Sequence, residues 1–329
     1  MQTFVPIEFQ QARDFSKKLN ATFEFIKQNI KPLTRCLLYI AGPPMLIGSI
    51  LAGKLYTGYF DFVMGFSRNQ GNPEMMVDYL TSPILWIQIA GAILLMLASF
   101  VVIVSVVNNY MLEYEATKSN NITVEAIWER VRNTLPMYFG TTLLYWLLLM
   151  AGYILIVLII AGAGFLSVFL GVIVGIVTVL AFIYMLVALS LIFVVRTWEK
   201  TSFFEAVSRC FTLVKDKWWS TFGLLLVASI IQSTIASAFL IPWYINFFIS
   251  MMHSLEGGPV AEPSFISELI NNVFMTLYFI VSFLLYAIPL LALAFQYFNL
   301  VELKEAKGLL TKIETIGQTP ASQPKDEQY

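Results

Sequence analysis

Few side chains in this sequence are suited to metal or nucleophilic chemistry. The 329 residues include one histidine, His253, and two cysteines, Cys36 and Cys210. Metal sites built on histidine and thiolate need several such ligands, which these three residues cannot supply. Both cysteines lie beside basic residues at helix ends that are predicted to be cytoplasmic. Because the cytoplasm is reducing, we expect free thiols rather than a disulfide. We therefore expect no catalytic residue, no metal and no cofactor, and a protein that is not an enzyme.

The long apolar stretches contain uncharged polar residues but no ionisable ones. An ionisable group inside a membrane span is the usual mark of a proton or ion pathway. Here every Asp, Glu, Lys and Arg lies outside the apolar stretches or at their ends. This pattern argues against ion-coupled chemistry within the membrane.

A path for a neutral or hydrophobic solute is one hypothesis for the remaining polar residues. Gly42 is followed by Pro43 and Pro44 in one apolar stretch, where a break or kink is expected, and Pro289 interrupts another. Broken helices can form transporter binding sites. The candidate path residues, which combine this break with polar side chains of another stretch, are Pro43, Pro44, Gln232 and Ser233. The alternative is that they serve packing and interhelical hydrogen bonding.

Composition and hydropathy predict an all-α, polytopic membrane bundle of about six transmembrane helices. Hydrophobic residues make up 58% of the chain and charged residues 12%, whereas soluble domains carry about 25% charged residues. A bilayer core requires roughly 20 apolar residues in helical form. The stretches that meet this requirement are 34–53, 84–107, 137–161, 166–195, 221–249 and 273–300.

The distribution of basic residues predicts the direction of these spans. Of the 20 lysines and arginines, only Lys54 and Arg68 fall on one side, and the others fall on the side of the two termini. Basic residues are concentrated in cytoplasmic loops. We therefore expect a multi-pass membrane protein with both termini in the cytoplasm. A net charge of −1 gives no reason to expect nucleic acid as a partner.

Amphipathic segments precede the odd-numbered spans. One stripe comprises Phe15, Leu19, Phe23, Ile26 and Ile30, and a second lies 188 residues further on, at Phe203, Val207, Phe211, Val214 and Trp218. Such stripes are typical of cytoplasmic in-plane helices at the membrane interface, and the alternative is packing against the spans. A weaker middle stripe from Val124 is predicted to end at Pro136.

The stripes divide one membrane domain, 1–310, into possible repeats 1–110, 111–197 and 198–310. The polar tail 311–329 is predicted to be disordered. Basic residues flank the stripes, and those we expect to contact anionic lipid headgroups, or a cytoplasmic or membrane protein partner, are Lys17, Lys18, Lys27, Lys215 and Lys217. A non-enzymatic scaffold that binds lipid or a partner is therefore the leading hypothesis, ahead of solute transport.

Two segments carry a family resemblance. Residues 13–29 (RDFSKKLNATFEFIKQN) and 211–223 (FTLVKDKWWSTFG) resemble a group of six-span membrane proteins of unassigned activity from Bacteroidota. The layout is also similar to membrane domains found beside glycerophosphodiester phosphodiesterases. Members of the first group are often labelled carotene oxygenases, which hold iron with a set of histidines that this chain lacks. The resemblance implies the six-span fold, a place in a bacterial inner membrane and no functional residue.

Overall fold

The computed structural model describes residues 4–68, 71–255, 265–306, 308–310 and 313, and all the regular secondary structure among them is helical. The helices are α1 (Phe15–Cys36), the π-helix η1 (Leu37–Ala41), α2 (Gly42–Arg68), α3 (Pro73–Thr81), α4 (Pro83–Thr117), α5 (Val124–Leu166), α6 (Val168–Leu189), α7 (Ile192–Glu199), α8 (Phe203–Val214), α9 (Trp218–Ser237), the 3₁₀ turn η2 (Ala238–Leu240), α10 (Ile241–Leu255), α11 (Phe265–Leu285) and α12 (Ala287–Glu305). The predicted disordered tail lies outside the described residues apart from Ile313.

Six helical segments of the described chain are long and apolar enough to cross a membrane. They are Phe15–Phe60, Pro83–Thr117, Val124–Leu166, Val168–Glu199, Trp218–Ile249 and Glu268–Glu305. Five of them contain a predicted stretch completely, and Val168–Glu199 contains all of 166–195 except its first two residues. The prediction of an all-α, six-span bundle is therefore confirmed. By helix length and hydropathy, the chain is a multi-pass membrane protein.

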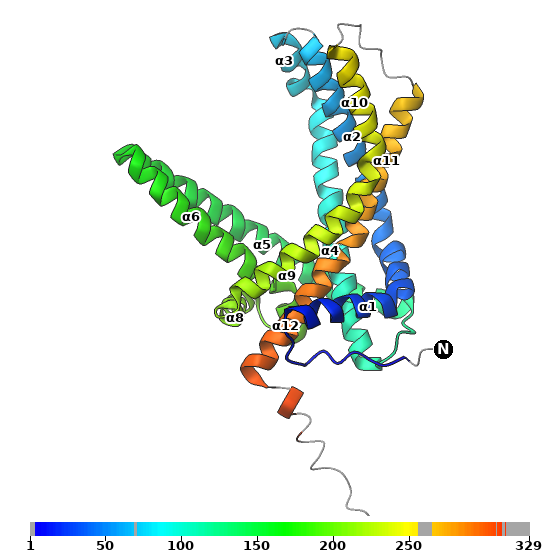
Figure 1. Ribbon diagram of the computed structural model, residues 1–329, viewed down its shortest axis with the longest axis vertical. Coiled ribbons are helices and arrows are strands. Elements are labelled where there is room, and N and C mark those ends of the chain that lie inside the picture. Colours follow the sequence, from blue (N-terminus) through cyan, green and yellow to red (C-terminus); the bar gives the residue numbers. More distant parts are fainter. Residues whose placement is uncertain (1–3, 69–70, 256–264, 307, 311–312, 314–329) are drawn as a thin grey trace, which may run out of the picture.

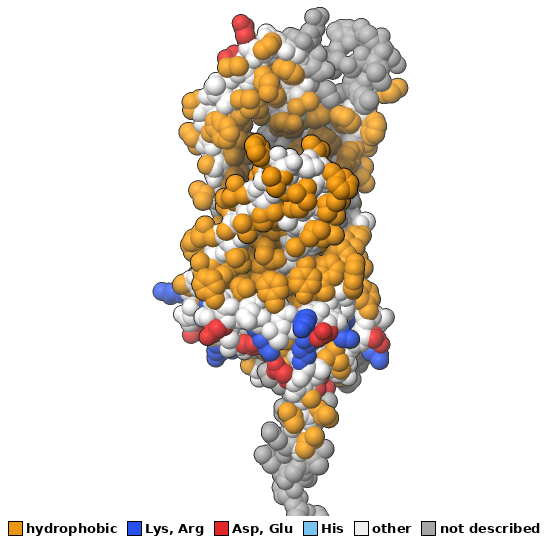
Figure 2. Space-filling model, turned by 90° about the vertical axis from the view of Figure 1, so that its left-hand side faces the viewer, with side chains coloured by type: hydrophobic (Ala, Val, Ile, Leu, Met, Phe, Trp, Pro, Cys, Tyr) orange, Lys and Arg blue, Asp and Glu red, His pale blue; other side chains and the backbone are white. Residues whose placement is uncertain are grey.

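The helices meet at one end of the molecule and separate toward the other. The α5–α6 hairpin diverges from the upright group that includes α2, α4, α10 and α11, while α1 crosses the foot of the molecule (Figure 1). On the face shown in Figure 2, charged side chains form a band across this foot, and the surface above the band is largely apolar. We call the foot the basic end, because it carries the lysines and arginines of α1 and of the turn between α8 and α9.

Helices α1 and α8 begin at equivalent positions of the predicted repeat. Asp14 caps α1 by accepting a hydrogen bond from the Lys17 amide, and Ser202 caps α8 in a capping box with Glu205. These caps lie 188 residues apart, the same separation as the apolar stripes. The threefold repeat itself stays a prediction.

The apolar stripes of these two helices face different surroundings. On α1, Phe15, Phe23 and Ile30 are exposed by 40%, 38% and 55%, and a different face of the helix is buried. On α8, Phe203 and Val214 are buried in the core. Helix α1 therefore has the outward apolar surface of an interfacial helix, whereas α8 packs its stripe inward as an ordinary amphipathic helix does.

The predicted helix end at Pro136 is wrong. Helix α5 is continuous from Val124 to Leu166 with Pro136 inside it. Proline in a helix costs roughly 3 kcal/mol by removing one hydrogen bond and crowding a carbonyl. Ending the helix here would expose several backbone groups beside an apolar segment, where each unpaired group costs more than in water. The continuous helix is the less costly solution.

The other prolines alter the helices near the predicted positions. The π-helix Leu37–Ala41 directly precedes Gly42, Pro43 and Pro44. A π-helical turn is therefore found where a break or kink was expected. Proline rings crowd the carbonyl four residues earlier, and a π-turn relieves that crowding. Near Pro289 the helix is interrupted at Tyr286, which separates α11 from α12.

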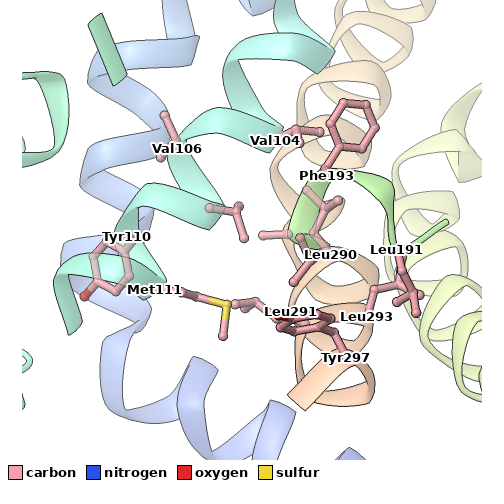
Figure 3. Close-up of a cluster of buried hydrophobic side chains, with 14 of the residues drawn as sticks. Val104, Val106, Tyr110, Met111, Leu191, Phe193, Leu290, Leu291, Leu293 and Tyr297 are labelled. Atoms are coloured by element: carbon pink, nitrogen blue, oxygen red, sulfur yellow. The ribbon is translucent and has the colours of Figure 1, made fainter. Parts of the chain in front are cut away.

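The hydrophobic core lies mainly at the basic end. Its buried residues come largely from the second half of α4, from α7 and from α12, and side chains such as Tyr110, Phe193, Leu291 and Tyr297 gather between these elements (Figure 3). By contrast, the tip of the α5–α6 hairpin exposes Phe165 by 94%. The outer halves of the spans therefore present apolar side chains to the surroundings, as lipid-facing helices do.

The segment before α1 inserts one aromatic side chain into this core. Phe9 is 1% exposed and stacks on Phe298 at 5.0 Å and on Tyr114 at 5.6 Å between ring centroids. The backbone amide of Arg13 donates to Asn299 Oδ1 at 2.6 Å and holds the segment against α12. Phe9 thus links the N-terminal segment to α4 and α12.

We expect Phe9→Ala to destabilise the protein by about 3–5 kcal/mol, because it empties a buried aromatic site. The measurement is thermal unfolding in detergent micelles. Phe204→Ala is the matched control, because Phe204 is 74% exposed, and it should shift the midpoint little. Equal midpoints for the two variants would contradict the assignment of Phe9 to the core.

Candidate functional site

The predicted lipid-contact lysines fall into three groups in the structure. Lys215 and Lys217 are exposed and lie together in the turn between α8 and α9. Lys17 and Lys27 are exposed on α1, where Lys17 forms an ion pair with Asp14 at 3.5 Å. The remaining residue of the set, Lys18, is buried. Only the first group lines a cleft among the cavities described.

We call this cavity the basic cleft. It has a volume of about 640 Å³ and lies between the C-terminal half of α6 and the start of α9. Its lining residues are Leu180, Ile183, Tyr184, Lys215, Asp216, Lys217, Trp218, Trp219 and Ser220. The cleft therefore has an apolar wall from α6 and a charged, hydrogen-bonding wall from the turn.

The first turn of α9 gives the cleft unpaired backbone donors. Helix α9 begins at Trp218, and its N-cap residue, Lys217, makes no side-chain cap hydrogen bond. The first amides of a helix have no partner within it, and the helix dipole makes this end favourable for anions. The amides concerned belong to Trp218, Trp219 and Ser220, which all line the cleft. The dipole thus adds to the charges of the two lysines.

Aromatic residues hold the turn against α6. The rings of Trp218 and Tyr184 stack at 5.8 Å, and Trp218 Nε1 donates to the Tyr184 carbonyl at 3.2 Å. Neighbouring Trp219 is 76% exposed. An exposed tryptophan beside lysines, next to an apolar surface, is typical of the boundary between lipid tails and headgroups. The cleft therefore combines aromatic, apolar and basic side chains.

Lys18 is not at the surface, which corrects its prediction as a lipid contact. Its side chain is 2% exposed, and Nζ donates to Ser220 Oγ at 2.7 Å and to Gln296 Oε1 at 2.6 Å. Gln296 Nε2 in turn donates to Thr221 Oγ1 at 2.8 Å. The apolar stripe predicted that the face with Phe15 and Phe23 would be packed and that Lys18 would lie outside it. The structure instead buries the face of α1 that contains Lys18 and Phe25. Sequence periodicity alone could not distinguish these two faces.

The candidate solute-path residues have structural partners or lie at the surface. Gln232 Nε2 donates to the Ser282 carbonyl of α11 at 3.1 Å, and Ser233 Oγ donates to the Ile230 carbonyl of its own helix. Pro43 is exposed and Pro44 half-buried beside the π-turn. These contacts match the alternative interpretation, in which polar residues join helices and prolines shape them.

The basic cleft includes residues that the sequence did not single out. Ser220, Tyr184 and Trp219 were not predicted to belong to a site, and Trp218 was predicted only as the last residue of the second apolar stripe. The signal for Ser220 was its position directly after the Lys-Asp-Lys-Trp-Trp run, residues 215–219. For Tyr184 no local signal existed, because it comes from a different span.

Comparison with family models, with curated proteins and with solved structures finds no match to this chain. Within the part of the chain that the structure describes, no group of three or more His, Cys, Asp or Glu residues could hold a metal ion. The chemistry of the basic cleft is therefore that of its own donors: ammonium groups, a hydroxyl and helix amides, all suited to an anion.

We expect both cysteines to be unreactive in the folded protein. Cys36 and Cys210 are free and buried, and burial raises the pKa of the Cys210 thiol to about 12. The reactive thiolate of Cys210 is therefore scarce at pH 8 and becomes abundant only as the pH approaches that pKa. Mass spectrometry after maleimide treatment should show no adduct on native protein and two after denaturation. Rapid labelling of native protein would contradict this burial.

Proposed function

We propose that this multi-pass membrane protein binds anionic phospholipids through the basic cleft. The observation that carries the proposal is the combination of Lys215, Lys217 and the uncapped start of α9 in one cleft of about 640 Å³. Phosphate oxygens are favourable ligands for such donors. Neutral headgroups would leave the two lysines without a compensating charge.

An apolar groove beside the cleft supports a lipid rather than a soluble anion. The groove has a similar volume of about 640 Å³ and runs along α6 toward the hairpin tip, with Val172, Gly175 and Ile176 among its lining residues. Leu180 lines both the groove and the cleft. A headgroup in the cleft would therefore place an acyl chain against an apolar surface, where burial is favourable.

The one acidic residue of the cleft does not cancel its positive charge. The Asp216 carboxylate lies 3.4 Å from Lys304 Nζ, a lysine of α12. That lysine also donates to the Thr212 carbonyl. Lys215 and Lys217 therefore remain as the exposed positive charges next to the helix start. Their attraction for an anionic membrane surface is worth about 1 kcal/mol for each residue.

The proposal places the basic end on the cytoplasmic side of a bacterial inner membrane. Support comes from the concentration of lysine and arginine at this end and from the band of charges seen there (Figure 2). Helix α1 would lie in the same interface, with Phe15, Phe23 and Ile30 toward the lipid. The role proposed is that of a non-enzymatic protein that organises or senses lipids. A protein partner at the same lysines is the competing occupant.

We expect the double variant Lys215→Gln/Lys217→Gln to lose most of its preference for anionic lipid. Two basic residues at about 1 kcal/mol each correspond to roughly a 30-fold change. The measurement is native mass spectrometry of the full chain after equilibration with equal amounts of phosphatidylglycerol and phosphatidylcholine. The quantity compared is the ratio of the two lipids that remain bound.

The matched control is Lys31→Gln/Arg132→Gln, which removes the same charge from exposed positions outside the cleft. This control should keep the preference of the unaltered protein. Equal losses in both double variants would show a general surface-charge effect and would refute the basic cleft as the site. An unaltered protein without any lipid preference would favour a protein partner instead.

A further inference from the structure

Lys18 is a buried cation whose hydrogen-bond acceptors are all neutral. Its ammonium group donates to a serine hydroxyl and to a glutamine carbonyl, as described above. The acidic residue one turn earlier, Asp14, forms its ion pair with Lys17. Among the ion pairs of the described residues, none includes Lys18. Asp14 also attracts Lys18 electrostatically, whereas the positive charge of Lys217 repels it. A buried charge without an ion-pair partner is costly, and a further anion nearby would relieve that cost.

Ser220 connects this buried charge to the basic cleft. Its Oγ accepts the hydrogen bond from Lys18 and therefore keeps its own O–H available for donation. Ser220 also lines the cleft beside Lys217. An acceptor in the cleft could thus bind the hydroxyl that Lys18 polarises, since hydrogen bonds in a chain strengthen one another.

The same network fixes the position of the helix start. Thr221 Oγ1 accepts from Gln296 and donates to the Lys217 carbonyl at 3.1 Å. The chain of bonds from Lys18 through Gln296 and Thr221 therefore reaches the N-cap residue of α9. Lys18 both places a positive charge behind the cleft and holds the backbone that forms its floor.

We propose that the cleft selects lipids whose headgroup ends in a phosphate monoester, and that Lys18, acting through Ser220, determines this selection. The inference rests on the proposed function and names its substrate class. A phosphate monoester carries about −1.5 to −2 charges at pH 7 and offers three acceptor oxygens. Three residues that line the cleft carry donors for such a group, namely Lys215 and Lys217 with their ammonium groups and Ser220 with its hydroxyl.

A phosphodiester headgroup matches this set less well. It carries one negative charge, and one of its oxygens is blocked by the headgroup alcohol. The extra positive charge of Lys18 would then remain uncompensated. Lys18 does not need to touch the lipid for this effect, so it is a positioning residue, and Ser220 is the residue that contacts the phosphate.

The test compares phosphatidic acid with phosphatidylglycerol. Both lipids are diluted in equal amounts in the same phosphatidylcholine vesicles, which contain the full chain. Native mass spectrometry measures the ratio of the two anionic lipids bound at pH 7.5 and at pH 5. We expect the unaltered protein to favour phosphatidic acid by about fivefold at the higher pH, the value of one additional charge contact. The preference should shrink at pH 5, because the second ionisation of the phosphate has a pKa near 6.

Lys18→Met and Ser220→Ala should each bring the ratio close to one and remove its dependence on pH. Lys31→Gln is the matched control on the same helix, because it removes an exposed charge outside the cleft, and it should keep the ratio. If Lys18→Met does not fold, Ser220→Ala decides, since it leaves the bond from Lys18 to Gln296 in place.

The outcomes separate this inference from the proposed function. Equal enrichment of both anionic lipids over phosphatidylcholine would keep the proposed function and overturn the selection of a monoester. A preference for phosphatidic acid that persists in Lys18→Met and in Ser220→Ala would overturn the role of these two residues. No enrichment of either lipid would refute both proposals.

Discussion

The packed core at the basic end is the constraint on which the rest of this structure depends. Above it, the spans expose apolar side chains, and helices in lipid gain no hydrophobic driving force from meeting one another. The core instead combines buried aromatic rings with interhelical hydrogen bonds, such as Tyr110 to Asn29 and Tyr138 to Thr197. With the helices joined at this end, the α5–α6 hairpin can diverge from the other spans (Figure 1).

The same core positions the basic cleft. Residues of α1 and α12 form the network of Lys18 and Gln296, and this network ends at the backbone of Lys217, where α9 begins. On the other side, Tyr184 of α6 stacks on Trp218. The cleft is therefore set between rigid helices rather than on a free loop, which is the arrangement that holds donors in fixed positions.

Much of the fold could be predicted because the bilayer restricts the possible structures. Long uncharged stretches permit only helices, so the number of spans followed from hydropathy. The caps Asp14 and Ser202 are also local features, because each bonds within the first turn of its own helix, but they were identified only in the structure. The predicted helix end at Pro136 was wrong because losing one hydrogen bond costs less than ending the helix in apolar surroundings.

What the sequence by itself determined is the class of the protein, the six spans and the concentration of positive charge at one end, because these depend on composition and local periodicity. What only the tertiary structure decided is which faces are buried and which distant residues meet. Lys18, Ser220 and Gln296 come from three helices, and nothing in their local sequences indicates that they share hydrogen bonds. The basic cleft likewise exists only because α6 packs beside the α8–α9 turn, a contact set by the shape of the whole core.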